Sequence, residues 1–254
     1  MKTKAFFLGI VCLVSLSLSA QDTIRIMTYN VAVGLMANMQ QIGQYIKEQN
    51  VDIVALQEVD LRTYRSETPR ERGKNQMAEL GYYSDLLPVF GQVCHHPTGG
   101  YYGLGFLSKN PIMSITNVPL PKTVDSKEPR SMIVASWEIN GKKFTIANTH
   151  LSVDIKEREM QMKYIKKYMK KVQGIKFVMG DLNSNAPEGL VQKIFSNWKD
   201  ALPEGQVTFS VDKPYYKIDY MLYESKSPIE VINAKVDSPR MSDHFPCYID
   251  IVIK

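Results

Sequence analysis

Hydrophobic residues along this chain recur mostly with the period of a β-strand. Residues 23–31, "TIRIMTYNV", alternate between two faces, as in a strand with one buried face. Residues 51–59, "VDIVALQEV", form a compact apolar run that is typical of a strand buried on both faces. Similar patterns predict further strands at residues 104–108, 131–138, 143–149, 175–180, 218–223, 229–236 and 247–253.

Two longer segments have the spacing of amphipathic helices. The first covers residues 36–50, and a shorter helix is predicted at 76–80 after the polar, basic loop 60–75. The second long helix covers residues 155–174 and has one apolar stripe, made of Met162, Ile165, Met169 and Val172. Its lysines lie off that stripe. We interpret them as a solvated face near the helix C-terminus, in preference to a nucleic-acid patch.

Strands outnumber helices and mix with them, which indicates an α/β or α+β class. The composition, with 44% hydrophobic and 22% charged residues among 254, is that of an ordinary globular protein and excludes a disordered chain. Because no Pro/Gly/Ser-rich linker divides the sequence, we expect a single domain over residues 21–254. Cys94 and Cys247 could form a disulfide or remain free thiols.

The first 20 residues have the features of a secretory signal peptide. Lys2 and Lys4 precede the apolar run "AFFLGIVCLVSLSLSA", which favours cleavage near Ala20 and an exported protein. Val11 before Cys12 disfavours a lipoprotein anchor. Cleavage would remove two lysines and no acidic residue, so the net charge would fall from +5 to +3. A net charge of +3 is too small to indicate a nucleic-acid partner.

Polar residues whose side chains could bind a metal or transfer a proton follow or interrupt the apolar runs: Asn30, Glu58, His150, Asp181, Asn183, Asp219, Asp243 and His244. Each alone could be a turn former or a solvated side chain. Together their carboxylates and amides supply hard oxygen ligands, which suit Mg²⁺ or Mn²⁺ and not zinc. The two histidines, together with the Asp219 carboxylate within an apolar strand, could transfer protons. This inventory favours hydrolysis of a phosphate ester, in which a cation neutralises phosphoryl charge and a base activates water.

Eight short motifs, in order, resemble the endonuclease/exonuclease/phosphatase family: "MTYNV", "LQEVD", "LSKNPI", "EPR", "NTHL", "GDLN", "KIDYML" and "SDHFP". The resemblance extends from about Thr23 to about Ile251. It implies a deoxyribonuclease I-like, four-layer α/β/β/α sandwich of two packed mixed β-sheets. The active site would then lie on loops at one edge of the sheets.

The resemblance also implies roles for the polar residues. Glu58 would be the main metal ligand, with Asn30 holding or orienting it and Asp243 as a further metal-side carboxylate. His244 would be the general base and Asp219 its orienting carboxylate. The remaining roles fall to Asp181 (positioning water or a second metal), Asn183 (donating to a phosphoryl oxygen) and His150 (stabilising the transition state or assisting the leaving group).

Several positions near these motifs are less well defined. Arg130 of "EPR" could contact phosphate or be an ordinary surface arginine, and Tyr102 could shape the substrate pocket. We expect His95 and His96 on an exposed loop near the mouth of the site, not as metal ligands. Leu104 replaces an asparagine that many family members carry, so we expect no substrate contact there.

These features predict an exported, Mg²⁺- or Mn²⁺-dependent phosphohydrolase that acts on a phosphodiester as a monomer, without a protein partner. Two alternatives are a nuclease and a sphingomyelinase-like enzyme that acts on a phospholipid headgroup. A remote alternative is a non-catalytic binding module on the same fold. A nuclease requires a basic groove. The loop residues Arg62, Arg65, Arg70, Arg72 and Lys74 could form one.

Overall fold

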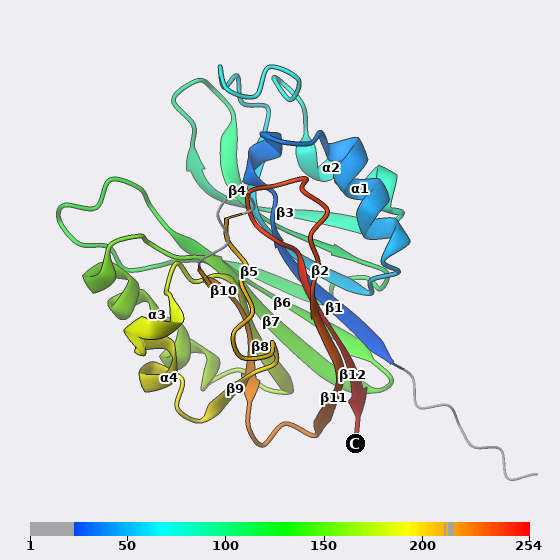
Figure 1. The fold of residues 1–254 in the computed structure, drawn as a ribbon, viewed down its shortest axis with the longest axis vertical. Coiled ribbons are helices and arrows are strands. Elements are labelled where there is room, and N and C mark those ends of the chain that lie inside the picture. Colours follow the sequence, from blue (N-terminus) through cyan, green and yellow to red (C-terminus); the bar gives the residue numbers. More distant parts are fainter. Residues whose placement is uncertain (1–22, 211, 213–215) are drawn as a thin grey trace, which may run out of the picture.

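Two six-stranded mixed β-sheets pack face to face in the computed structural model, which describes residues 23–210, 212 and 216–254 (Figure 1). The first sheet has the order β11-β12-β1-β2-β4-β3, with bounds β1 Ile24–Asn30, β2 Ile53–Leu61, β3 Leu87–His95, β4 Tyr101–Ser108, β11 Ile229–Val236 and β12 Cys247–Ile253. The second has the order β5-β6-β7-β8-β10-β9, with bounds β5 Ser114–Pro119, β6 Ser131–Ile139, β7 Lys142–His150, β8 Ile175–Asp181, β9 Trp198–Asp200 and β10 Asp219–Glu224. The predicted signal peptide lies outside the described residues.

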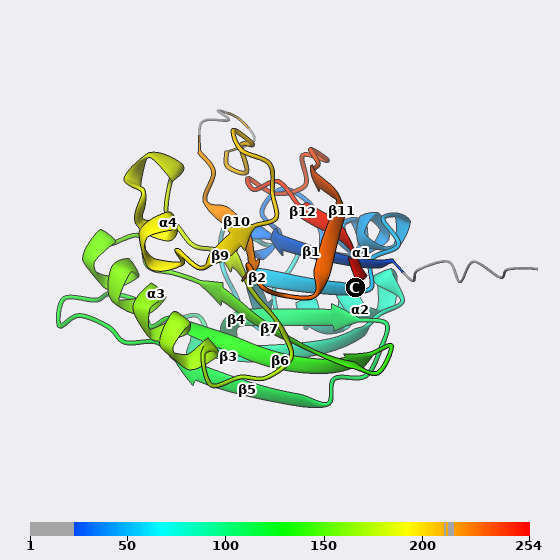
Figure 2. The ribbon, with the colours of Figure 1, turned by 90° about the horizontal axis from the view of Figure 1, so that it is seen from below.

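Helices cover the outer face of each sheet (Figures 1 and 2). On the first sheet lie α1 (Met39–Glu48) and α2 (Gln76–Ser84), and on the second lie α3 (Ile155–Met169) and α4 (Leu190–Ile194). Two short 3₁₀ turns, η1 (Ala32–Gly34) and η2 (Ala186–Glu188), follow β1 and β8. The predicted four-layer α/β/β/α sandwich is therefore confirmed.

Three hydrophobic layers hold this arrangement together. The central layer fills the space between the sheets and includes Phe106 and Trp137, whose rings meet edge to face with centroids 5.2 Å apart. The two outer layers lie under the helices, where Met162, Ile165 and Met169 of α3 are fully buried, as the stripe predicts. The lysines of α3 lie on its exposed or half-exposed face, off the apolar stripe as predicted.

A buried polar network joins the two sheets at the end that carries the candidate site. Gln57 Nε2 of β2 donates to Asn148 Oδ1 of β7 at 2.7 Å, across the space between the sheets. Asn148 Nδ2 in turn donates to the backbone oxygens of Leu56 and Gly105, each at 2.9 Å. Because an unpaired buried amide costs about 1–3 kcal/mol, this network fixes how the sheets sit against each other.

Some elements differ from the sequence prediction. Strands β3, β5 and β9 and helix α4 were not predicted. β3 contains Pro88 and Gly91, and β5 is a mostly exposed edge strand ending in Pro119, so neither has a clear alternation. Cys94 and Cys247 are free thiols, so a disulfide between them is wrong. In the part of the chain that the structure describes, no helix is long and apolar enough to span a membrane.

Candidate active site

Strand pairing brings the polar residues of the second sheet into one row. His150 ends β7, Asp181 ends β8 and Asp219 begins β10. In the registers of these strands, Asp181 is paired with His150 on one side and with Asp219 on the other. Because neighbouring strands are about 4.8 Å apart, the three side chains can reach a common space above the sheet edge.

Glu58 enters this space from the first sheet because of an irregularity in β2. The pairing of β2 with β4 shifts register between Leu56 and Val59, and Glu58 has a left-handed backbone with φ of 55°. A bulge of this kind re-aims the side chain of the extra residue. A left-handed conformation at a residue other than glycine is costly and typical of functional sites. The bulge therefore explains why Glu58 points to the second sheet.

Asn30 at the end of β1 connects Glu58 of the first sheet with Asp181 of the second. Its Nδ2 donates to Glu58 Oε1 at 3.0 Å and to Asp181 Oδ2 at 3.2 Å, and it lies 3.3 Å from His244 Nε2. Its Oδ1 accepts from the backbone N–H of Ala32 at 3.0 Å, which fixes the orientation of the amide. The fully buried Asn30 thus holds three candidate reactive groups in one place.

His244 and Asp219 form a buried pair. His244 Nδ1 donates to Asp219 Oδ2 at 2.9 Å, and the other ring nitrogen lies 3.5 Å from Asp181 Oδ2. Burial lowers the pKa of His244, but Asp219 and Asp181 outweigh this effect and raise it to about 10. The Phe209 ring packs against the imidazole, with centroids 4.7 Å apart.

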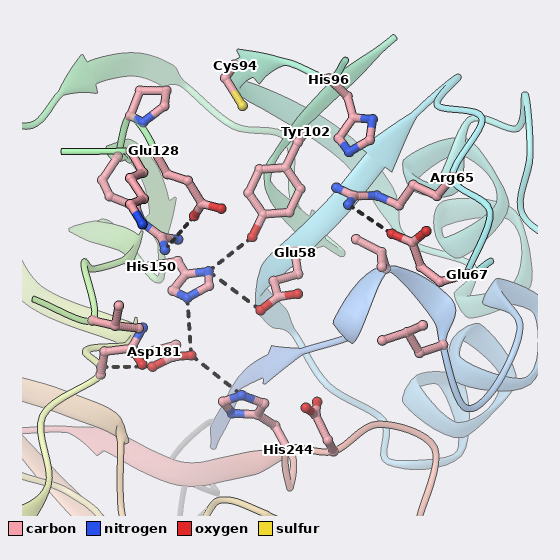
Figure 3. Close-up of a pocket in the computed structure, with 18 of the residues that line it drawn as sticks. Glu58, Arg65, Glu67, Cys94, His96, Tyr102, Glu128, His150, Asp181 and His244 are labelled. Atoms are coloured by element: carbon pink, nitrogen blue, oxygen red, sulfur yellow. Dashed lines mark hydrogen bonds and ion pairs between the residues drawn. The ribbon is translucent and has the colours of Figure 1, made fainter. Parts of the chain in front are cut away.

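His150 occupies the opposite side of the space (Figure 3). Its Nδ1 lies 3.2 Å from the Tyr102 hydroxyl and 3.8 Å from Glu58 Oε1, and its Nε2 lies 3.4 Å from Asp181 Oδ2. Burial and the nearby Arg130 guanidinium hold the pKa of His150 well below its usual range. This imidazole is therefore neutral near pH 7, and it can donate or accept a hydrogen bond.

The carboxylates of this site fit a divalent cation. Burial is the main cause that raises the pKa of Glu58 and the pKa of Asp181, the latter to about 7. Donor atoms of Glu58, His150 and Asp181 lie within 4.8 Å of one another, as do those of Asp181, Asp219 and His244. Crowded, desolvated oxygen donors are the arrangement that a hard cation stabilises. Asp243 lines the same cavity but belongs to neither group of donors.

The other candidate residues also lie at this site. Asn183 Nδ2 donates to the backbone oxygen of Leu151 at 2.8 Å, and the residue lines the cavity. Arg130 is only 8% exposed and lines the cavity with Tyr102, so the alternative of an ordinary surface arginine is wrong. His95 and His96 line the cavity; His96 lies in the loop after β3, but His95 is the last residue of that strand, so the expectation of a loop is wrong for His95. Leu104 is buried in the central core.

The sequence reasoning missed two residues that support the base. Ser242 Oγ donates to the backbone oxygen of Asn30 at 2.7 Å and accepts from the backbone N–H of His244 at 3.3 Å. Thr208 Oγ1 accepts from the backbone N–H of Asp219 at 3.0 Å. Ser242 stands inside a recognised motif, "SDHFP", so its position was available from the sequence. Thr208 lies outside all of the motifs.

The first turn of α3 links the loops around the cavity. Glu157 accepts hydrogen bonds from the Thr123 hydroxyl and the Ser126 hydroxyl, each at 3.0 Å, which anchors the loop between β5 and β6. Arg158 Nη2 donates to both carboxylate oxygens of Glu188, at 2.9 and 2.7 Å, which anchors the loop after β8. One helical turn therefore positions loops that are distant in sequence.

The resulting cavity has a volume of about 870 Å³ and is lined by residues of both sheets, among them Glu58 of β2, His150 of β7 and Asp181 of β8 (Figure 3). Volumes of this size are typical of small-molecule sites. The cavity is much larger than a phosphoryl group alone requires.

Comparisons with known proteins agree with this geometry. A model described as "Endonuclease/Exonuclease/phosphatase family" matches residues 27–244. Among solved structures, an endonuclease/exonuclease/phosphatase from Beutenbergia cavernae DSM 12333 has a TM-score of 0.75 at 20% identity, covering 91% of this chain and 72% of that one. A second from Bacteroides vulgatus has a TM-score of 0.74 at 20% identity, covering 92% of this chain and 100% of that one.

A Bacteroides thetaiotaomicron mannosyl-6-phosphatase has a TM-score of 0.73 at 15% identity, covering 91% of this chain and 100% of that one. No curated protein matches the chain. The low identities show a shared fold, and the family model shows membership. The chain therefore belongs to the endonuclease/exonuclease/phosphatase family, whose members are divalent-metal-dependent hydrolases of phosphate-ester bonds.

Proposed function

We propose that this protein is an exported phosphodiesterase that depends on Mg²⁺ or Mn²⁺ and uses water activated by His244. The observation that carries the proposal is the buried His244–Asp219 pair, whose free ring nitrogen faces Asp181 and Asn30. Export rests on the sequence pattern of residues 1–20 alone.

His244 and Asp219 supply the base. With Nδ1 donating to Asp219, the deprotonated Nε2 faces the site and can accept a proton from water; because Asp219 and Asp181 raise the pKa of His244 to about 10, this form requires the cation described next. Asp219 then stabilises the imidazolium that forms. The Phe209 ring packs against the imidazole, and both His244 and Asp219 are buried, which holds the pair in this geometry. Proton transfer by a positioned side chain contributes about 10²- to 10⁴-fold in rate.

Glu58 and Asp243 would hold the cation, with Asn30 orienting Glu58 and Asp181 positioned for a second metal or the water. A bound Mg²⁺ or Mn²⁺ would neutralise charge on the phosphoryl oxygens and on these carboxylates, and would oppose protonation of His244. The carboxylates of Glu58 and Asp181, whose donor atoms lie within 4.8 Å of each other, support this choice of ion, whereas the part of Asp243 rests on the family motif and on its place in the cavity lining.

His150, Asn183 and Arg130 surround the place where the phosphoryl group would lie. The neutral His150 imidazole can donate to a developing negative charge, and Tyr102 orients it through Nδ1. Asn183 has a second amide hydrogen beyond the one given to Leu151. Space remains in the cavity for organic groups on the phosphate, which supports a diester substrate.

Hydrolysis of bis(p-nitrophenyl) phosphate tests the proposal. We expect turnover with Mg²⁺ that stops when a chelator is added, and a loss of at least about 10²-fold in His244→Ala. Thermal unfolding of the variant establishes that it is folded. Wild-type turnover in a folded His244→Ala protein would refute the role of His244.

A further inference from the structure

The mouth of the cavity carries paired cationic and anionic side chains on two sides. On one side Arg65 Nη1 lies 3.5 Å from Glu67 Oε1, and on the other Arg130 Nη2 lies 2.9 Å from Glu128 Oε2. The glutamates reach solvent, whereas the arginines are largely buried. In Figure 3 Arg65 and Glu67 lie on the opposite side of the pocket from Glu128. The entrance is therefore not a uniformly basic surface.

The position of the charges along the lining disfavours a polyanionic substrate. Among the described residues that line the cavity, the carboxylates are Glu58, Glu67, Glu128, Asp181 and Asp243, and the cations are Arg65, Lys127, Arg130 and His244, whose pKa is raised to about 10. A cation at the floor offsets the carboxylates there, but Glu67 and Glu128 remain at the mouth. A nucleic-acid strand binds through Lys and Arg contacts to successive phosphates. Here its further phosphates would approach two glutamates.

The basic loop proposed for a nucleic-acid groove contributes little to the cavity. Of its five basic residues, Arg65 is the one found among the described residues that line the cavity. Arg65 itself pairs with Asp60 at 2.6 Å. Arg72 Nε donates to the backbone oxygen of Arg65 at 2.8 Å, and Lys74 Nζ lies 3.5 Å from Glu71. These cations mainly hold the loop in its own conformation.

The side chains at the mouth suit hydroxyl groups. An ionised carboxylate only accepts hydrogen bonds, and a guanidinium only donates them. A hydroxyl group does both, so it can bind a neighbouring Glu–Arg pair without changing its charge. A cationic group would instead meet Arg65, Lys127 and Arg130, and an anionic group would meet Glu67 and Glu128.

We infer that the substrate is a phosphate ester of an uncharged, hydroxyl-rich organic group such as a sugar, recognised by the Arg65–Glu67 and Arg130–Glu128 pairs. This inference rests on the proposed function, because it assigns the group attached to the phosphate in the same cavity. It distinguishes the protein from a nuclease and from an enzyme that recognises a cationic lipid headgroup.

A matched series of p-nitrophenyl diesters tests the inference, since all release the same chromophore. The second substituent is methyl, a hexose attached through O6 (glucose, galactose or mannose), choline, or thymidine 3′-phosphate attached through O5′. We expect at least one hexose ester to exceed the methyl ester about tenfold or more in kcat/KM, a gain equivalent to one well-placed polar contact. The choline and thymidine 3′-phosphate esters should have a lower kcat/KM than that hexose ester.

Variants connect that preference to the named pairs. Glu67→Gln and Glu128→Gln should each reduce the ratio of hexose to methyl kcat/KM several-fold and raise the relative rate of the thymidine 3′-phosphate ester. Glu230→Gln makes the same chemical change on exposed β11, away from the cavity, and should leave the ratio as it is.

The outcomes are distinguishable. Release of nitrophenolate from every ester without a hexose preference would overturn this inference alone. The same conclusion follows if the choline or the thymidine 3′-phosphate ester is best, or if neither glutamine variant alters the ratio. Absence of release from all of the esters in the presence of Mg²⁺ would overturn the proposed function, and this inference with it.

Discussion

Replacing Asp219 with Asn would test the proton-transfer geometry with a minimal change of shape. The carboxylate accepts from His244 Nδ1 at 2.9 Å and is buried in the native structure. An amide nitrogen placed there can donate to Nδ1, which moves the ring hydrogen to Nε2. An imidazole in that tautomer cannot accept a proton from water at Nε2, so the base is lost while the volume is kept.

The magnitude follows from the contribution of a positioned base. We expect kcat to fall by about 10²- to 10⁴-fold with little change in KM, because the lost interaction acts on the transition state. The charge-assisted hydrogen bond is worth about 1.5–3 kcal/mol, and this loss is offset in part by no longer burying a carboxylate. Against a typical stability of about 5–15 kcal/mol, the variant should remain folded.

The assay is nitrophenolate release from bis(p-nitrophenyl) phosphate at saturating Mg²⁺, with circular dichroism and thermal unfolding to confirm folding. Asp85→Asn is a matched control, since Asp85 is exposed and lies in a loose 3.6 Å ion pair with Lys47. We expect it to keep the parent rate. A folded Asp219→Asn protein with kcat within about threefold of the parent would refute the reasoning.

Two further substitutions test the metal site and the sheet interface. Glu58→Gln keeps an oxygen for the Asn30 hydrogen bond but removes a charge, so the Mg²⁺ concentration for half-maximal rate should rise about tenfold or more in a metal titration; an unchanged midpoint would exclude Glu58 as a ligand. Asn148→Leu leaves the Gln57 amide and two backbone oxygens without their buried partner, so urea unfolding should show a loss of at least about 1–3 kcal/mol. An unaltered urea midpoint would contradict the bridging role of Asn148.

The ends of strands were the most predictable part of the site. Apolar runs followed by an abrupt polar residue place His150 and Asp181 at strand ends from the sequence alone, whereas Asp219 was predicted inside its strand and instead begins β10. The pairing that sets them side by side depends on contacts between strands far apart in the chain, which periodicity does not encode. The family motifs provided that missing information.

Other features had no sequence signal of their own. The bulge at Glu58 arises from pairing with β4, since nothing in "LQEVD" indicates a left-handed backbone there. β1 was predicted to have one buried face, but Met27 and Tyr29 on the other face are buried beneath α1. Phe209 lies in an irregular segment, and its contact with His244 depends on the tertiary structure.

The candidate reactive groups and the recognition pairs belong to different parts of the architecture. Asn30 and His150 end strands and Glu58 lies at the bulge within β2, next to the Gln57–Asn148 link between the sheets, whereas Glu67 and Glu128 lie on surface connections. Insertions or exchanges in these connections would leave the strand registers intact. Selection can therefore change which molecules such a scaffold accepts while the chemistry that it performs on them is inherited unaltered.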